Sequence, residues 1–186
     1  MQDALFTPVP GFDQPIAVLK HCHDRIRKQI STMQRLLSHL PRHGADIDAQ
    51  QAAKSILQYF NKAAPNHHAD EENDLLPMLQ ASAAGDDAIL LQQLLPLILQ
   101  EHQQMDAAWQ VLDRQLQGIA TGENASTGSP LLEQDVSRFA ELYASHMQKE
   151  ETHIAPMAMR LFSAEQMAQL GKAMQMRRGI TLNNQE

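Results

Sequence analysis

Length, composition and charge exclude several classes of protein. The 186 residues can bury the core of one compact domain, with 43% hydrophobic but only 4% aromatic residues. A net charge of −7 without a basic stripe argues against nucleic-acid binding, and the single cysteine excludes an internal disulfide framework. The start, MQDALFTPVPGFDQP, lacks the features of a signal peptide, and no apolar stretch approaches the ~20 residues of a membrane span. We therefore expect a soluble cytoplasmic protein without nucleic-acid or membrane partners.

Apolar residues recur at helical spacing along nearly the whole chain, and no alternating strand pattern appears. The pattern predicts four long helices over approximately residues 16–40, 46–79, 87–116 and 129–161. The longest predicted loop is the polar segment TGENASTGSP, and Pro130 is expected in the first turn of the helix that follows it. Ser163 and Gln166 form a candidate capping box that opens a short C-terminal helix.

Three prolines, Pro65, Pro77 and Pro96, fall inside these predicted helices. Each removes a backbone donor and should kink or loosen its helix locally. The kinks could simply be tolerated, or they could re-aim side chains that bind a ligand.

The chain repeats one pattern at an offset of 79 residues, which separates His23 from His102, His67 from His146 and Glu71 from Glu150. The segments HHADEENDLLP (67–77) and HMQKEETHIAP (146–156) each contain H-x-x-x-E, with a proline six residues after the glutamate. The same offset relates Leu37/Leu116, Phe60/Phe139, Glu72/Glu151 and Met78/Met157. The chain thus looks like two copies of one helical hairpin. Packed face to face, they would form an all-α, antiparallel up-and-down four-helix bundle, with the short C-terminal helix added.

Each copy of the hairpin predicts three metal ligands. The two side chains of H-x-x-x-E lie one helical turn apart on one face, and the histidine of the preceding helix can reach the same height. A single H-x-x-x-E is usually a surface ion pair. Two matched copies on a stripe of Leu, Ile and Met favour metal binding, because these polar groups would be costly to bury without a partner. The predicted ligands are His23, His67, Glu71, His102, His146 and Glu150.

Over residues 12–162 the chain resembles the hemerythrin-like, HHE cation-binding family of bacterial proteins. The segments that carry the resemblance are CHDRI (22–26), HHADEENDLLP, EHQQMD (101–106) and HMQKEETHIAP. The resemblance implies a non-haem di-iron centre with carboxylate and oxo or hydroxo bridges, held by the six residues named above. Imidazole and carboxylate ligands without thiolate suit iron, manganese or zinc, and the resemblance selects iron. Residues 1–11 would be an N-terminal extension, and residues 163–186 a C-terminal helix and tail.

The chain departs from oxygen-carrying hemerythrin at two positions. Asp106 stands where that protein has a second histidine on its third helix. On the last helix the repeat selects His146 with Glu150, rather than the H-x-x-x-x-D pattern of that protein. The missing fifth histidine counts against simple oxygen carriage.

Three functions remain open from the sequence. The chain could bind or sense a small diatomic molecule such as O₂ or NO, act as a di-iron oxidoreductase on peroxide or O₂, or store iron or repair iron centres. We favour O₂-reactive di-iron binding. Whether the chain turns over a substrate and which protein it meets are not determined by the sequence.

Several residues near the predicted ligands have two interpretations. His68 and Glu72 form another H-x-x-x-E pair, but Met147 at the repeat position of His68 favours an outer role for it. Asp106 could be an extra ligand or an orienting carboxylate. His153 could cap the core or supply a proton near the metals. The pair Arg177–Arg178 is predicted to be a solvated helix end.

Overall fold

The computed structural model describes residues 9–122 and 130–180. Within these ranges every regular element is helical, which confirms the all-α class. The longest α-helices are α1 (Pro15–His43), α5 (Asp86–Ala120) and α6 (Glu133–Lys149). The shorter ones are α2 (Ile47–Gln58), α3 (Ala64–Asp70), α4 (Leu76–Ser82), α7 (Ala155–Leu161) and α8 (Ala164–Arg177). Three π-helical turns connect some of them: η1 (Tyr59–Ala63), η2 (Glu71–Leu75) and η3 (Glu150–Ile154).

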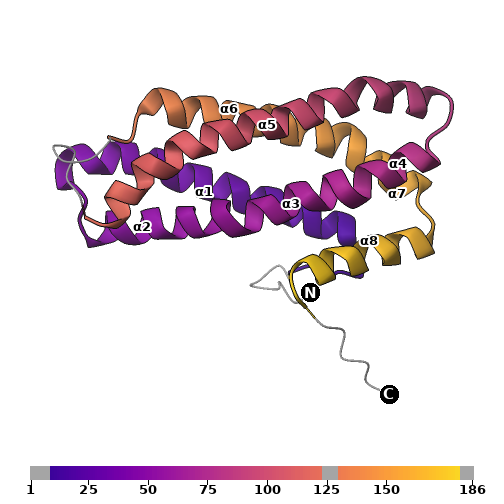
Figure 1. The fold of residues 1–186 in the computed structure, drawn as a ribbon, viewed down its shortest axis with the longest axis horizontal. Helices are drawn as coiled ribbons and strands as arrows, with labels where there is room; N and C mark the ends of the chain where they lie inside the picture. Colours follow the sequence, from indigo (N-terminus) through magenta and orange to yellow (C-terminus); the bar gives the residue numbers. More distant parts are fainter. Residues whose placement is uncertain (1–8, 123–129, 181–186) are drawn as a thin grey trace, which may run out of the picture.

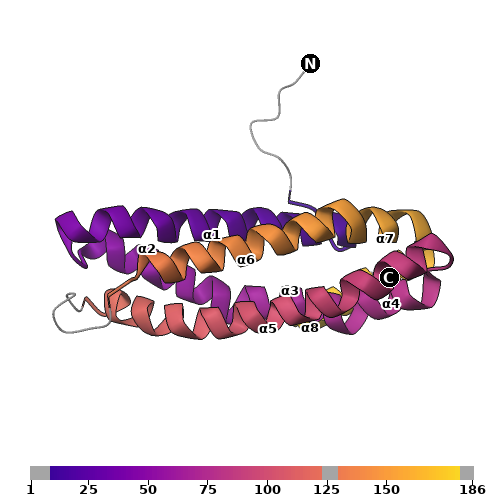
Figure 2. The same cartoon turned by 90° about the horizontal axis from the view of Figure 1, so that it is seen from above.

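Four helical arms lie alongside one another in an elongated molecule (Figures 1 and 2). The arms are α1, the segment α2–α4, α5, and the segment α6–α7. Helix α1 contacts α2 and α6, α5 contacts the same two helices, and α4 contacts α7, so each arm touches at least two others. Helix α8 lies against α1 and α3. Among the described residues, no helix is long and apolar enough to cross a membrane.

Two hydrophobic clusters fill the interior, one toward each end of the arms. One contains Ile26, Phe60, Met105 and Phe139, and the other contains Leu19, Leu75, Ile98 and Ile154. Phe60 and Phe139 hold the same repeat position, and their ring centroids are 5.0 Å apart. Along α1 the clusters are separated at His23, and along α5 at His102. The predicted ligands therefore form a buried polar layer between two apolar regions.

Each π-helical turn closes one residue before a proline. The closing bonds run from Ala64 N–H to Tyr59 O before Pro65, from Leu76 N–H to Glu71 O before Pro77, and from Ala155 N–H to Glu150 O before Pro156. The widened turn accommodates a proline, which lacks a donor and crowds the preceding helical turn. The turns η2 and η3 share the 79-residue offset and begin at the two predicted carboxylate ligands.

The predicted loosening is therefore found at Pro65 and Pro77, but it is wrong at Pro96, because α5 continues as an α-helix through that residue. Because η2 and η3 begin at Glu71 and Glu150, the extra residue in each turn changes the direction of the helix face that follows the carboxylate. This placement favours the second interpretation of the prolines, in which they re-aim ligands.

Some predicted boundaries were wrong. Helix α1 passes through Pro41 to His43 and ends at Gly44, whose φ of 64° suits glycine. Helix α6 begins at Glu133 rather than near residue 129; Pro130 precedes it, and Ser129, with most of the segment TGENASTGSP, lies outside the described residues. The backbone N–H of Leu132, the residue before α6, donates to the Gln115 side chain. The capping box at Ser163 and Gln166 is confirmed.

The pair Arg177–Arg178 is not a solvated end, which corrects the prediction. Both guanidinium groups donate to Asp70, whose side chain is 0% exposed, and Arg178 Nη2 lies 2.6 Å from Asp70 Oδ2. Arg177 also donates to Asp74 at 2.6 Å. A buried carboxylate requires such partners, so this clamp fastens α8 to the second arm.

Candidate metal centre

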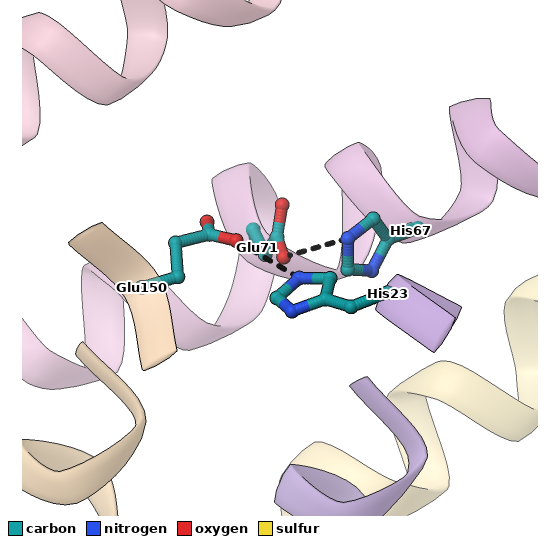
Figure 3. Close-up of side chains that lie close together, drawn as sticks. All are labelled: His23, His67, Glu71 and Glu150. Atoms are coloured by element: carbon teal, nitrogen blue, oxygen red, sulfur yellow. Dashed lines mark ion pairs between the residues drawn. The ribbon is translucent and has the colours of Figure 1, made fainter. Parts of the chain in front are cut away.

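The six predicted ligands meet in the polar layer, and none is more than 4% exposed. They form two groups that share both glutamates. The first position is surrounded by His23, His67, Glu71 and Glu150 (Figure 3). The second position is surrounded by Glu71, His102, His146 and Glu150. In each group, one possible ligand atom of every residue lies within 4.8 Å of those of the others.

Each carboxylate directs one oxygen to each position. Glu71 Oε1 lies 3.2 Å from His67 Nε2, and Glu71 Oε2 lies 3.4 Å from His102 Nε2. Glu150 Oε2 lies 3.1 Å from His23 Nε2, and Glu150 Oε1 lies 3.3 Å from His146 Nε2. Both glutamates therefore lie between the two histidine pairs, as bridging ligands must.

The buried polar atoms without a hydrogen bond are concentrated here. Among the described residues they are His23 Nε2, His67 Nδ1, His67 Nε2, Glu71 Oε2, Glu150 Oε1 and Glu150 Oε2. All belong to the predicted ligand set, and native proteins rarely bury such groups unsatisfied. Imidazole nitrogens and carboxylate oxygens that converge in this way fit a pair of metal ions.

Three other carboxylates hold the outer nitrogens of the histidines. Glu151 Oε1 lies 2.9 Å from His23 Nδ1, and Glu72 Oε1 lies 2.5 Å from His102 Nδ1. Glu101 Oε2 lies 3.3 Å from His146 Nδ1. A carboxylate that accepts the Nδ1 hydrogen fixes the ring and leaves Nε2 for a metal.

The sequence did not predict this outer layer. Glu72 and Glu151 share the 79-residue offset, so the repeat carried a signal that could have identified them. Glu101 carried none, because its repeat position is Cys22. His67 is the repeat equivalent of His146, the partner of Glu101, and its Nδ1 has no hydrogen-bond partner in the described part of the chain.

The pKa values of the buried ligand residues are shifted in opposite directions. Burial opposes protonation of His146, but the charge of Glu150 and the hydrogen bond that Glu101 accepts from His146 raise its pKa to about 10. Burial, together with the charge of His23, lowers the pKa of His67 well below its usual value. Burial and the charge of Glu150 raise the pKa of Glu71 to about 7. Burial has the same tendency at Glu150, but the neighbouring His146 holds its pKa well below the usual range.

The residues with two interpretations all lie outside both groups. His68 is buried and stacks on His102 with ring centroids 4.1 Å apart, and its Nε2 lies 3.5 Å from the hydroxyl of Tyr143. This position agrees with an outer role for His68, which stays a prediction. Asp106 is exposed, and His153 is half-buried in η3.

A pocket of about 450 Å³ leads to the first position. At its inner end are His23, Glu71 and Glu150, and its walls include Ile16, Leu19, Leu75 and Ile154. The pocket is therefore mostly apolar but ends at the predicted ligands.

A family model described as "Hemerythrin HHE cation binding domain" matches residues 14–158. A relative from Haemophilus influenzae, described as "Uncharacterized protein", is 28% identical over 169 residues, covering 91% of this chain and 92% of the relative. The family match spans all six predicted ligands.

Proposed function

This chain belongs to the hemerythrin HHE cation-binding domain family, and we propose that it holds two iron ions and binds or reacts with O₂ or a related diatomic molecule. The observation that carries the proposal is the position of the two glutamates. Each offers one oxygen to each histidine pair at 3.1–3.4 Å from the nearest imidazole nitrogen. Two carboxylates placed in this way suit two neighbouring ions rather than one.

We infer that residues 12–162 form the predicted domain, an antiparallel up-and-down four-helix bundle, with α8 as an appended helix. Residues 1–8 of the predicted extension and 181–186 of the predicted tail lie outside the described residues. The inference is supported by the contacts of α1 and α5 with both α2 and α6. The repeat supports it as well, because it places one histidine on each of the four arms and one glutamate on each of two.

The residues of this chain would have distinct tasks. The four histidines and two glutamates would hold the ions, with two nitrogens and two carboxylate oxygens at each position. Glu72, Glu101 and Glu151 would fix the histidine rings through Nδ1. The two hydrophobic clusters would keep bulk water from the centre.

Four protein ligands at each position would leave each ion open to further ligands, including a small outside molecule. Asp106 is exposed and outside both ligand groups, so it does not fill the place of the fifth histidine of oxygen-carrying hemerythrin. Bound iron with an open site would supply electrons and a binding position for a small ligand. Both ions, rather than one, would be open, which favours oxidation over reversible carriage.

The pocket favours a second candidate, an oxidoreductase that acts on peroxide or O₂ together with a larger molecule. A channel that serves only a diatomic ligand does not need about 450 Å³. Release of iron to an acceptor protein would instead indicate iron storage or repair of iron centres.

Stopped-flow mixing of the di-ferrous protein with oxygenated buffer tests the main proposal. We expect oxidation within seconds, seen as a new absorption that argon does not reverse. Full reversal under argon would indicate carriage. A di-ferrous form that is stable for hours in air would exclude O₂ and favour NO or iron handling.

A further inference from the structure

The pocket at the first metal position is large for the small ligands considered above. Its volume is about 450 Å³, whereas one water molecule takes roughly 30 Å³ in the liquid. Pockets of roughly 300–1,000 Å³ with apolar walls and a few polar groups usually hold organic molecules. The size therefore indicates an organic ligand.

The lining changes in character from the inner end to the rim. Four carboxylates line the pocket: Glu71 and Glu150 are buried at the inner end, Glu151 is half-buried, and Asp13 is exposed. The walls between the ends carry aliphatic side chains from α1, η2 and η3, with Leu19 5% and Ile154 1% exposed. Met159, on α7, is 68% exposed and marks the rim. A molecule that fits this gradient has an aliphatic chain.

Lys20 indicates the chemistry of the other end of such a molecule. It is exposed, lies on α1 three residues before His23, and is the one permanent cation among the described lining residues. It forms no ion pair with any residue in the described ranges. An ammonium group without an ion pair can attract an anionic head group to Lys20, whereas the inner carboxylates and the exposed Asp13 would repel one.

We propose that this pocket binds an aliphatic monocarboxylate, with its head group at Lys20 and its chain along Ile16, Leu19, Leu75 and Ile154. The chain end then points to the first metal position. Only this last placement rests on the proposed di-iron function, because the binding itself depends on the pocket walls and Lys20.

Calorimetric titration of the iron-loaded protein with octanoate, octanol and acetate tests the proposal. Each buried methylene strengthens binding about fourfold, so burial of three gives roughly 60-fold tighter binding of octanoate than of acetate. Octanol has the same chain without the charge, and a rim ion pair should favour octanoate by about two- to fivefold. Equal binding of octanoate and acetate would overturn the proposal.

Two variants locate the binding site. Ala17→Phe fills the pocket from α1 and should weaken octanoate binding at least tenfold, whereas Ala88→Phe, at a half-buried helical alanine outside the lining, should not. Lys20→Gln should abolish the preference for octanoate over octanol while leaving octanol binding unchanged. Circular dichroism checks that each variant is folded. Octanoate binding that survives both Ala17→Phe and Lys20→Gln would place the ligand elsewhere and refute the pocket assignment.

The orientation is tested by proton NMR of octanoate with the anaerobic di-ferrous protein. The paramagnetic ions should broaden the terminal methyl signal more than the signal beside the carboxylate. The opposite order would overturn the orientation. If the protein holds no iron pair, the proposed function fails, but octanoate titration of the purified protein still decides whether the pocket binds the ligand.

Discussion

In the second hairpin, residues 86–161, His146 Nδ1 lies 3.3 Å from Glu101, whose other oxygen lies 2.6 Å from Lys149. In the first hairpin, residues 15–82, the equivalent histidine is His67, and its Nδ1 has no hydrogen-bond partner within residues 9–122 and 130–180. Cys22 stands at the position of Glu101, and Asp70, which binds Arg177 and Arg178, stands at the position of Lys149. The hairpins are thus alike at the six inner residues and different one layer further out.

This difference separates two kinds of requirement. The proposed pair of ions would need the same donors from both halves, which agrees with inner residues that share the repeat. The outer residues orient the histidine rings, set the local charge and attach α8, and they differ between the two hairpins. Arg27 bonds Glu151 at 2.7 Å in one half, whereas exposed Asp106 occupies the matching position of the other.

Removal of an inner ligand should have the largest effect and should distinguish shared from unshared residues. Glu71→Ala removes an oxygen from both positions and should lower iron content at both. His67→Ala removes a ligand only from the first position, so about one iron should remain at the second. Metal analysis with melting curves measures both effects, since lost metal also lowers stability. Equal iron contents of the two variants would contradict the assignment of Glu71 as a shared ligand.

The clamp on Asp70 should produce the next largest effect. The double variant Arg177→Met, Arg178→Met leaves a buried carboxylate without a cation, which costs about 3–5 kcal/mol of unfolding free energy. Lys149 stands at the repeat position of Asp70 and pairs with Glu101. Lys149→Met should cost about 1 kcal/mol or less of unfolding free energy, because the Lys149–Glu101 pair is more exposed. Urea unfolding of both variants provides the comparison. A double variant as stable as the unaltered protein would show that α8 does not depend on the clamp.

The outer carboxylates should affect metal affinity moderately. Glu101→Gln should weaken the second position about 10–100-fold, as loss of a carboxylate partner of a ligating histidine typically does. Glu72→Gln should have a similar effect through His102, whereas Asp106→Asn, at an exposed residue outside the groups, serves as the control. Competition with a metal chelator gives the affinities. If all three variants match the unaltered protein, the outer layer has no role in metal binding.

Proton release should accompany metal binding, and its effect on affinity should be the smallest of those described. The pKa of His146 is raised to about 10 by Glu150 and Glu101 against the effect of burial, and that of Glu71 to about 7 by burial and Glu150. Both groups must lose their protons to bind metal, so metal affinity should fall as the pH is lowered from 8 to 6. Each proton that must be released lowers the affinity by about tenfold or less per pH unit. Calorimetry in two buffers with different ionisation enthalpies counts the protons. Identical heats in both buffers would contradict these pKa shifts.

The sequence was sufficient to predict that the six inner residues lie together. The motif H-x-x-x-E has a fixed geometry on a helix, and the 79-residue offset matched the two halves. It was also sufficient for the all-α class. It could not reveal that Glu71 and Glu150 begin π-helical turns, since a proline six residues later does not specify how the backbone will accommodate it. Pro96 illustrates this limit, because the same residue type lies within the uninterrupted helix α5.

The outer layer was harder to predict because it depends on contacts between arms. Glu101 and His146 are 45 residues apart, and Arg178 and Asp70 are 108 apart. No helical periodicity relates such pairs, and the repeat does not contain them. The partners of Arg177 and Arg178 depend on the packing of α8 against α3, which the sequence does not specify.

The most direct test of the central claim is a crystal structure of the iron-loaded protein, with anomalous diffraction recorded at the iron absorption edge. We predict two iron peaks, about 3.5–4 Å apart as in other two-metal sites, between the pairs His23–His67 and His102–His146. Glu71 and Glu150 should each contact both ions. A single iron peak, or two ions not bridged by these glutamates, would contradict the di-iron account.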